Sequence, residues 1–201
     1  MNENNDIHLS KTLCWILRHE AIKLGLPILV NGYIPVSIIL KHPSLRNYST
    51  TDVERVVVSN VKQRFGLRNN NGVLEICANQ GHSISVVDNS NLIPLNGDEN
   101  IDVIHGTFYK NWESIKIEGL SRAKRNHIHF ALGLPSDKSV ISGVRKNCQV
   151  FIYINLKLAT SDNLKFYRSA NGVILSPGNE NGFILPKYFI KVLDRSLINL
   201  I

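Results

Sequence analysis

Three arginines and a histidine, far apart along the chain, have side chains suited to binding a phosphate group. Arg18 and His19 are adjacent, and Arg64 follows Lys62 after one residue. Arg145 comes two residues after Gly143, a glycine that would let a ligand approach the backbone closely. A guanidinium can donate two parallel hydrogen bonds to phosphate, and an imidazole can donate a hydrogen bond or a proton beside it. Taken alone, each residue is better explained as an ordinary surface or partly packed side chain, because such short motifs are weak signals. Only a fold can show whether they surround one anion.

A second group of residues could hold a small polar ligand. His105-Gly106-Thr107 follows the apolar pair Val103-Ile104, so a strand ending in a small residue and a hydroxyl could hold an amide or a ribose edge. His127 and His129 would lie on one face of a strand, because alternate strand residues face the same side. Such a pair can bind a metal ion, but a third ligand with zinc-like spacing is not evident. The pattern therefore favours a ligand-binding face over a metal site.

Arg18 and His19 are predicted to lie late in an amphipathic helix. Apolar residues recur at helical spacing over residues 9–24. Ser10 is the expected N-cap of this helix, and Gly25 is its expected C-terminal stop.

Two further helices and a β-hairpin are predicted in the same half of the chain. One helix is expected near residues 36–40. The other begins at Ser49, where Ser-Thr-Thr-Asp fits a capping box. Its buried face is marked by Val53, Val56, Val57 and Val61. Residues 65–67 and 73–76, joined by an Asn-rich turn, form the hairpin. Three helices followed by a hairpin predict a winged-helix-like lobe.

The second half of the chain has a different pattern, which predicts a second lobe. Residues 88–102 are rich in Asn, Asp, Pro and Gly, so the boundary is placed there, giving lobes of residues 1–90 and 91–201. A helix over residues 112–118 is expected to end at Gly119. The predicted strands are 103–108, 128–132, 150–156, 172–175 and 189–193. This is an α+β lobe, and the lack of βαβ units and of GxGxxG argues against a Rossmann domain.

The composition favours an intracellular protein with a polyanionic partner. The chain has 201 residues, of which 43% are hydrophobic, and 23 Lys+Arg against 16 Asp+Glu give a net charge of +7. This surplus favours nucleic acid as a partner. Cys14, Cys77 and Cys148 form no CxxC pair, as expected of reduced thiols inside a cell. A polar N-terminus and the lack of a long apolar run indicate a soluble protein of the cytoplasm or nucleus, without a membrane partner.

Taken in order, the motifs resemble the RNA 2'-phosphotransferase family, and most closely its eukaryotic members. The similarity runs from about residue 8 to 194. The matching segments are 9–19, 62–65, 78–83, 105–107, 127–129, 142–145, 168–173 and 182–189. So many separate motifs in register make a chance resemblance implausible, unlike a lone pattern.

The resemblance implies an N-terminal winged-helix lobe that holds RNA and a C-terminal ADP-ribosyltransferase-like lobe that holds NAD. The catalytic quartet of the family falls on Arg18, His19, Arg64 and Arg145, and Lys62 joins these four in contacting the phosphate and RNA. The residues implied in NAD binding are His105, Gly106, Thr107, His129 and Val173. Val173 occupies the position where ADP-ribosyltransferases usually carry a glutamate. A charged 2'-phosphate is already a good nucleophile, so it needs no glutamate to activate it.

The implied reaction has two steps, and NAD is consumed as a cosubstrate without a metal. The RNA 2'-phosphate first displaces nicotinamide from NAD. The ribose O2'' then attacks the phosphorus, which releases RNA with a 2'-OH and ADP-ribose 1'',2''-cyclic phosphate. The expected partner is a tRNA with an internal 2'-phosphate, and a monomer is expected. Two alternatives are an ADP-ribosyltransferase that caps phosphorylated RNA or DNA ends, and a non-catalytic winged-helix RNA-binding protein.

Overall fold

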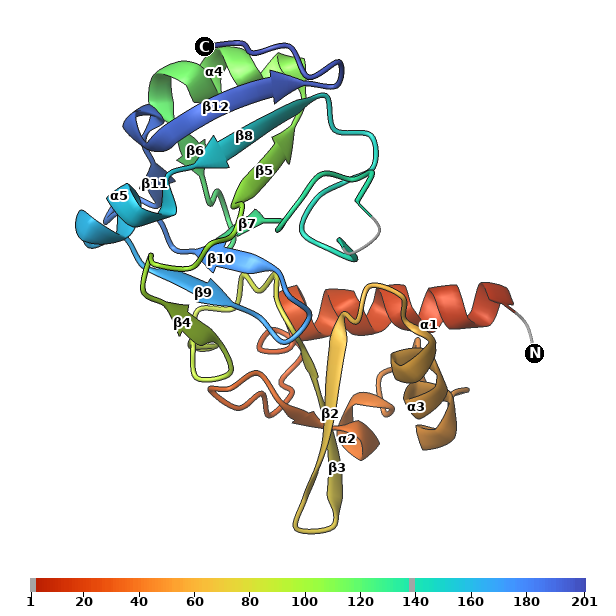
Figure 1. Ribbon diagram of the computed structural model, residues 1–201. Coiled ribbons are helices and arrows are strands. Elements are labelled where there is room, and N and C mark those ends of the chain that lie inside the picture. The colour runs from red at the N-terminus through yellow and green to blue at the C-terminus, as the bar shows by residue number, and fades with distance from the viewer. Residues whose placement is uncertain (1–2, 138–139) are drawn as a thin grey trace. The chain divides into compact units, whose positions relative to one another are not determined.

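The structure is a computed structural model that describes residues 3–137 and 140–201 (Figure 1). It combines a few helices with several small sheets. In the described part of the chain, all paired strands are antiparallel. The prediction of a fold that mixes helices and strands is therefore confirmed. The chain divides into two compact units, Met1–Asn91 and Leu92–Ile201. The boundary between them lies one residue later in the chain than the predicted one. None of the helices within the described ranges is both long enough and apolar enough to cross a membrane.

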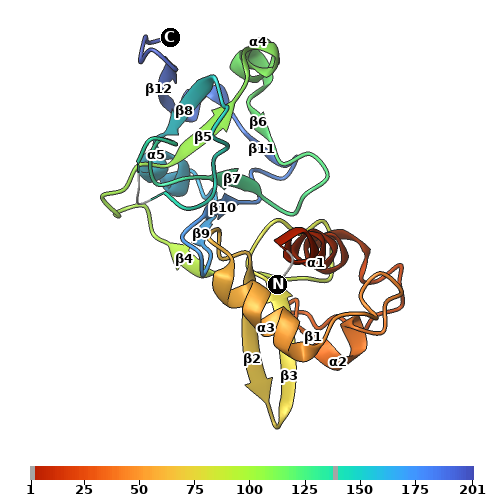
Figure 2. The ribbon, with the colours of Figure 1, turned by 90° about the vertical axis from the view of Figure 1, so that its right-hand side faces the viewer.

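The first unit contains helices packed with a small sheet. Its elements are α1 (Glu3–Trp15), η1 (Ile16–Glu20), β1 (Ile34–Pro35), α2 (Val36–Ile39), α3 (Thr50–Ser59), β2 (Phe65–Asn70) and β3 (Val73–Ala78). The sheet order is β1-β3-β2, and the β2–β3 hairpin extends away from the helices (Figure 2). Asn71 and Gly72 at its tip have positive φ angles of 50° and 84°, as a tight hairpin turn requires. The predicted hairpin and second helix are confirmed.

The first helix begins earlier than predicted. Since α1 starts at Glu3, Ser10 lies inside the helix, and its assignment as N-cap was wrong. The Ser10 hydroxyl instead accepts a hydrogen bond of 3.4 Å from Asn60 Nδ2. Beyond Trp15 the chain continues as the π-helical turn η1, and a left-handed Gly25 (φ 66°) follows five residues after its end.

The capping box predicted at the start of α3 is confirmed. The backbone N–H of Asp52 donates to Ser49 Oγ over 3.2 Å, and the backbone N–H of Ser49 donates to Asp52 Oδ2 over 2.8 Å. Val53 and Val56 are buried, as expected. Val61 is 82% exposed, because α3 ends at Ser59 and the helical periodicity no longer applies, so its predicted burial was wrong.

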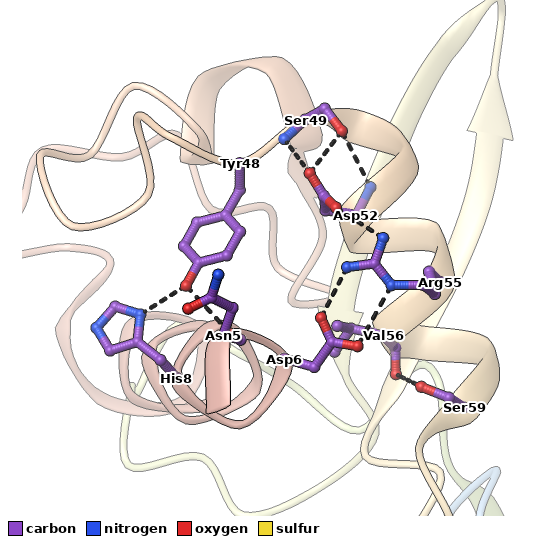
Figure 3. Close-up of polar contacts among 9 residues, drawn as sticks. All are labelled: Asn5, Asp6, His8, Tyr48, Ser49, Asp52, Arg55, Val56 and Ser59. Carbon is purple, nitrogen blue, oxygen red and sulfur yellow. Dashed lines mark hydrogen bonds and ion pairs between the residues drawn. The ribbon is translucent and has the colours of Figure 1, made fainter. Parts of the chain in front are cut away.

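Arg55 links α3 to α1 through two carboxylates (Figure 3). Its guanidinium contacts Asp6 of α1 at 2.7 and 3.3 Å and Asp52 of its own helix at 2.7 Å. Hydrogen bonds from Ser49 first, and from Arg55 next, lower the pKa of Asp52 to about 2. These contacts fix the two helices that form the groove described below.

The second unit is built from short antiparallel strands. Its elements are β4 (Ile93–Leu95), β5 (Ile104–Thr107), α4 (Tyr109–Glu118), β6 (Leu120–Ser121), β7 (Ile128–Phe130), β8 (Val150–Ile154), α5 (Leu156–Ser161), β9 (Phe166–Arg168), β10 (Ile174–Ser176), β11 (Phe183–Ile184), η2 (Pro186–Tyr188) and β12 (Phe189–Asp194). The sheets have the orders β4-β9-β10-β7, β12-β8-β5 and β11-β6. A bridge between Ile104 and Ala131 joins the ends of β5 and β7.

All five strands and the helix predicted in this half are present, with different ends. The strand predicted over residues 150–156 stops at Ile154, because the Asn155 side chain accepts a hydrogen bond of 3.0 Å from the N–H of Leu158 and caps α5. Helix α4 ends at Gly119, whose φ of 97° favours glycine. The short strands β4, β6, β9 and β11 were not predicted from the sequence.

The capping box predicts a pH-dependent contribution to stability. We expect Asp52→Asn to lower the free energy of unfolding by about 1 kcal/mol at neutral pH. Because folding lowers the pKa of Asp52 from 3.8 to about 2, this stabilisation is complete above pH 3.8 and is lost as the pH falls towards 2. Urea unfolding over this range should show wild type and variant converging in acid. Glu54→Gln, on the exposed face of α3, is the matched control, and an equal loss there would contradict the prediction.

Candidate functional site

Arg18, His19, Lys62 and Arg64, which are separated in the sequence, line one groove of the first unit. The groove has a volume of about 800 Å³ and lies between α1–η1 and the end of α3. Its other lining residues are Asp6, Ile7, Ser10, Lys11, Cys14, Trp15, Val56, Ser59, Asn60 and Val61. Tertiary structure therefore brings together the phosphate-binding candidates of the first half of the chain.

Arg18 and His19 are carried by the wide turn of η1. The N–H of Ala21 donates to the carbonyl of Ile16 over 3.0 Å, which is the five-residue spacing of a π-helix. Ile16 and Leu17 are fully buried, and the two polar residues that follow are half-buried. Single π-helical turns occur frequently at functional sites, because the extra residue redirects side chains that a regular α-helix would place elsewhere.

The segment after β3 fixes η1 from one side. His19 Nδ1 lies 2.9 Å from Ser83 Oγ, and the N–H of Ser83 donates to the carbonyl of Arg18 over 2.9 Å. Gly81 has a φ of 92°, and a Cβ there would lie 3.3 Å from the guanidinium carbon of Arg18. Glycine therefore allows the backbone to lie directly against the Arg18 side chain.

Arg64 is held by an asparagine at the end of α3. Asn60 Oδ1 accepts hydrogen bonds from the backbone N–H and from Nη1 of Arg64, over 3.1 and 3.4 Å. The preceding residue, Gln63, has a φ of 45°, which is unusual for a residue other than glycine. Asn79 Nδ2 donates to the Gln63 carbonyl over 2.7 Å and stabilises this turn. Such strained backbone is often found at binding sites.

The groove has a positive electrostatic character. Among its described lining residues are the cations Lys11, Arg18, Lys62 and Arg64, against the carboxylate of Asp6, which is engaged by Arg55. Burial raises the pKa of the Cys14 thiol, while the charges of Arg18 and Arg64 act in the opposite direction. Both guanidinium groups are thus close enough to influence one sulfur atom, and the arrangement suits an anion.

Arg145 lines a separate hollow of about 240 Å³ in the second unit. Four residues proposed for ligand binding line it too: His105, Gly106, Thr107 and His129. Of the remaining lining residues, the sequence had singled out Gly143, but not Phe108, Asn111 or Arg125. Arg125 precedes the His127-Ile128-His129 motif by two residues, and that proximity was the available signal. The pKa of Arg125 is lowered, first by desolvation and then by the charge of Arg145.

His105 is fixed in one tautomer. Its Nδ1 lies 2.9 Å from the backbone carbonyl of His129, and a carbonyl can only accept, so Nδ1 must carry the hydrogen. Desolvation lowers the pKa of His105, although the carbonyl opposes this shift. A neutral ring with a protonated Nδ1 leaves Nε2 as an acceptor. It can therefore accept a hydrogen bond from a hydroxyl group.

The glycines of this hollow serve packing. A Cβ on Gly106 would lie 2.8 Å from the sulfur of Cys148, and one on Gly143 (φ 95°) would lie 2.7 Å from the Phe130 carbonyl. The sequence suggested that the glycine near Arg145 lets a ligand approach the backbone. The close approach at Gly143 is instead made by the chain's own strand β7, because the loop carrying Arg145 lies against it.

Two residues named from the sequence have other surroundings. Val173 is buried in a turn closed by hydrogen bonds with Ser169, and it is absent from the described lining of the hollow. His127 contacts the ring of Tyr167 edge-on, with centroids 6.2 Å apart, whereas its predicted companion His129 lines the hollow. Within residues 3–137 and 140–201, no three His, Cys, Asp or Glu side chains are grouped to hold a metal ion.

Comparison with known proteins gives the family of this chain. The model of the RNA 2'-phosphotransferase, Tpt1 / KptA family matches residues 4–178. The chain belongs to this family. Its match includes Arg18, His19, Arg64 and Arg145 and most of both units.

Several RNA 2'-phosphotransferase family members are similar over nearly the whole chain. tRNA 2'-phosphotransferase 1 of Homo sapiens is 47% identical over 197 residues, 96% of this chain and 77% of the relative. tRNA 2'-phosphotransferase of Saccharomyces cerevisiae is 38% identical over 183 residues, 87% of this chain and 80% of the relative. A probable RNA 2'-phosphotransferase of Acaryochloris marina is 31% identical over 186 residues, 92% of this chain and 96% of the relative. Identity is higher to these two eukaryotic relatives than to the bacterial one.

The contact between Gly81 and Arg18 predicts an effect on anion binding. We expect Gly81→Ala to displace the Arg18 guanidinium and to weaken binding of inorganic phosphate several-fold, measured by calorimetry. Gly72→Ala is the matched control, because Gly72 has a similar φ of 84° but open space around its Cβ position. Both variants should lose about 1–2 kcal/mol of stability from the left-handed backbone. Equal phosphate affinity in the two variants would show that the contact does not position Arg18.

Proposed function

We propose that this protein removes the 2'-phosphate of a tRNA left by splicing and transfers it to the ADP-ribose part of NAD. The observation that carries the proposal is the cluster of Arg18, His19 and Arg64 in one positively charged groove. Membership of the RNA 2'-phosphotransferase family and the names of the human and yeast relatives support tRNA as the substrate.

The two units are proposed to have different ligands. We assign the first unit as a winged-helix-like RNA-binding lobe, supported by its helices, its antiparallel hairpin and its basic groove. We assign the second as an ADP-ribosyltransferase-like lobe that binds NAD, supported by its antiparallel sheets and polar hollow. A monomer is proposed as the working form, because one chain carries all four proposed phosphate ligands.

Residues of the hollow have the chemistry that a nucleotide ribose and amide require. The neutral ring of His105 can accept a hydrogen bond from a ribose hydroxyl. Asn111 and Thr107 add further polar groups to the hollow, where Asn111 Nδ2 donates to Thr107 Oγ1 over 3.3 Å. We propose His105, Gly106, Thr107 and His129 as NAD-binding residues, together with Val173 behind the surface. The arginines Arg125 and Arg145 suit the negative charge of a phosphate.

The proposed first step is a substitution at C1'' of the nicotinamide ribose. A 2'-phosphate oxygen forms a bond to C1'' while the bond to nicotinamide breaks and nicotinamide leaves with the electron pair. The product is an RNA phosphodiester bearing ADP-ribose. The phosphate enters already charged, so the protein has to orient it rather than remove a proton from it. Arg18 and Arg64 are proposed to provide this orientation.

The proposed second step is a transesterification at phosphorus. The ribose O2'' hydroxyl attacks the phosphorus and gives up its proton to solvent, the bond to the RNA 2'-oxygen breaks, and ADP-ribose 1'',2''-cyclic phosphate is released. Negative charge accumulates on the phosphoryl oxygens, where guanidinium groups stabilise it. Arg18, Arg64 and Arg145 are proposed as phosphate ligands, with Lys62 contributing charge. His19, positioned by Ser83, is the proposed proton donor to the leaving 2'-oxygen.

The decisive experiment follows the phosphate of a short RNA that carries one internal 2'-phosphate. We expect its loss to require NAD, to release nicotinamide and ADP-ribose 1'',2''-cyclic phosphate, and to continue in a metal chelator. Dephosphorylation without NAD, or activity lost to chelator and restored by magnesium or zinc, would contradict the mechanism. Accumulation of ADP-ribosylated RNA with no cyclic phosphate would indicate a capping ADP-ribosyltransferase. Absence of nicotinamide release would indicate a non-catalytic RNA-binding protein.

The phosphate ligands predict a specific kinetic defect. Each charge-assisted hydrogen bond is worth about 1.5–3 kcal/mol, so losing two in the transition state should slow the reaction by about two to four decades. We expect this of Arg64→Ala and Arg145→Ala, with ADP-ribosylated RNA accumulating in single-turnover assays. Arg64→Lys should recover only part of the rate, because lysine lacks the planar fork. Arg46→Ala, at an exposed arginine outside the groove, is the control. Near-normal rates in both alanine variants would refute the assignment.

A further inference from the structure

The groove of the first unit contains an exposed aromatic side chain that phosphate binding alone does not require. Trp15 is 45% exposed and lines the same groove as Arg18, His19 and Arg64. Tryptophan has a large apolar ring, so leaving it in water has a free-energy cost. Trp112, the second tryptophan of the chain, is 6% exposed and packs in the core of the other unit.

Trp15 lies close in the chain to two of the proposed phosphate ligands and lines the same groove. It is the last residue of α1, and Arg18 and His19 follow three and four residues later in the π-helical turn η1, where they line the same groove. Lys11, four residues before Trp15, lines the groove as well. α1 and η1 thus present an aromatic ring and positive charges to one groove.

The ring is supported without being covered. Trp15 and His42 make an edge contact with ring centroids 6.1 Å apart and an interplanar angle of 70°. Nearly half of the Trp15 surface stays accessible despite this contact. A ring held by a neighbour loses little conformational freedom when a ligand stacks on it, which favours binding.

The exposed apolar surface continues along the groove. Val61 is 82% exposed and Ile7 is 46% exposed, and both line it with Trp15. A free phosphate would interact only with the cations. A nucleotide combines an anionic phosphate with a flat, largely apolar base, so its two parts match the charges and the exposed ring.

We propose that Trp15 stacks on the base of a nucleotide adjoining the RNA 2'-phosphate. This inference rests on the proposed function, since it names how that substrate is recognised beyond its phosphate. Stacking on an aromatic side chain tolerates any base, because every base has a π-face. The protein would therefore require a base at this position of the RNA and accept different ones.

Tryptophan fluorescence tests the inference without depending on catalysis. A short 2'-phosphorylated RNA, titrated without NAD, should quench the emission of Trp15. An otherwise identical RNA with abasic residues on both sides of the 2'-phosphate should not. The Trp112→Phe variant has Trp15 as its sole tryptophan. If this core variant fails to fold, the fluorescence of Trp15 is obtained by subtracting the emission of Trp15→Phe from that of the wild type. Equal quenching by the two RNAs would overturn the inference.

Steady-state kinetics supplies a second test. We expect Trp15→Ala to raise the KM for RNA by about 5–100-fold while the KM for NAD stays unchanged, in line with the loss of one stacked base. Trp15→Tyr should keep most of the affinity, and Trp15→Leu, which is apolar but not aromatic, should not. Val58→Ala is the matched control, because Val58 is 86% exposed on α3 but is not among the lining residues of the groove.

The two proposals fail in different ways. If RNA dephosphorylation is absent but the base-dependent quenching is present, the proposed reaction is wrong and base stacking stands. If dephosphorylation is normal and Trp15→Ala leaves the KM for RNA unchanged, the reaction stands and the stacking proposal is wrong. A third outcome is that the emission of Trp15 falls as the protein concentration rises in the absence of RNA. This would show that Trp15 lies in a contact between copies of the protein, and it would overturn the inference.

Discussion

The first unit depends on holding like charges close together before any ligand arrives. Arg18 and Arg64 line one groove and both act electrostatically on the thiol of Cys14, so the surrounding structure has to hold two cations in the same region. Asn60 accepts two hydrogen bonds from Arg64, and the backbone at Gly81 lies against Arg18. A site prepared in this way does not have to reorganise when an anion binds, which is how preorganised charge contributes to binding and catalysis.

The helices that form the groove are joined by contacts outside it. Arg55 pairs with Asp6 on α1 and Asp52 on α3, and the capping box at Ser49 fixes the start of α3. Asp6 lines the groove, but its carboxylate is directed to Arg55, which lowers the pKa of Asp6 through a hydrogen bond. The same ion pair therefore joins the helices and offsets a negative charge that would oppose anion binding.

In the second unit, backbone geometry shapes the hollow that Arg125 and Arg145 line. The carbonyl of His129 fixes the tautomer of His105, and desolvation keeps that ring neutral. Gly106 and Gly143 allow neighbouring segments to approach more closely than any side chain would permit. This hollow combines hydrogen-bonding groups of short strands with two arginines, whereas the groove of the first unit presents positive charges from α1, from η1 and from the turn after α3.

The sequence alone predicted the family and most of the elements correctly, and it proposed the candidate phosphate ligands, because motifs, periodicity and capping residues are local signals. It identified the capping box at Ser49, but not the start of α1 or the exposure of Val61, since helix ends depend on which neighbours bury them. The π-helical turn at Arg18 and the hydrogen bonds from Asn60 to Arg64 also required the tertiary structure. So did the place of Trp15 beside those arginines, because whether an aromatic side chain is core or surface depends on packing between residues distant in the sequence.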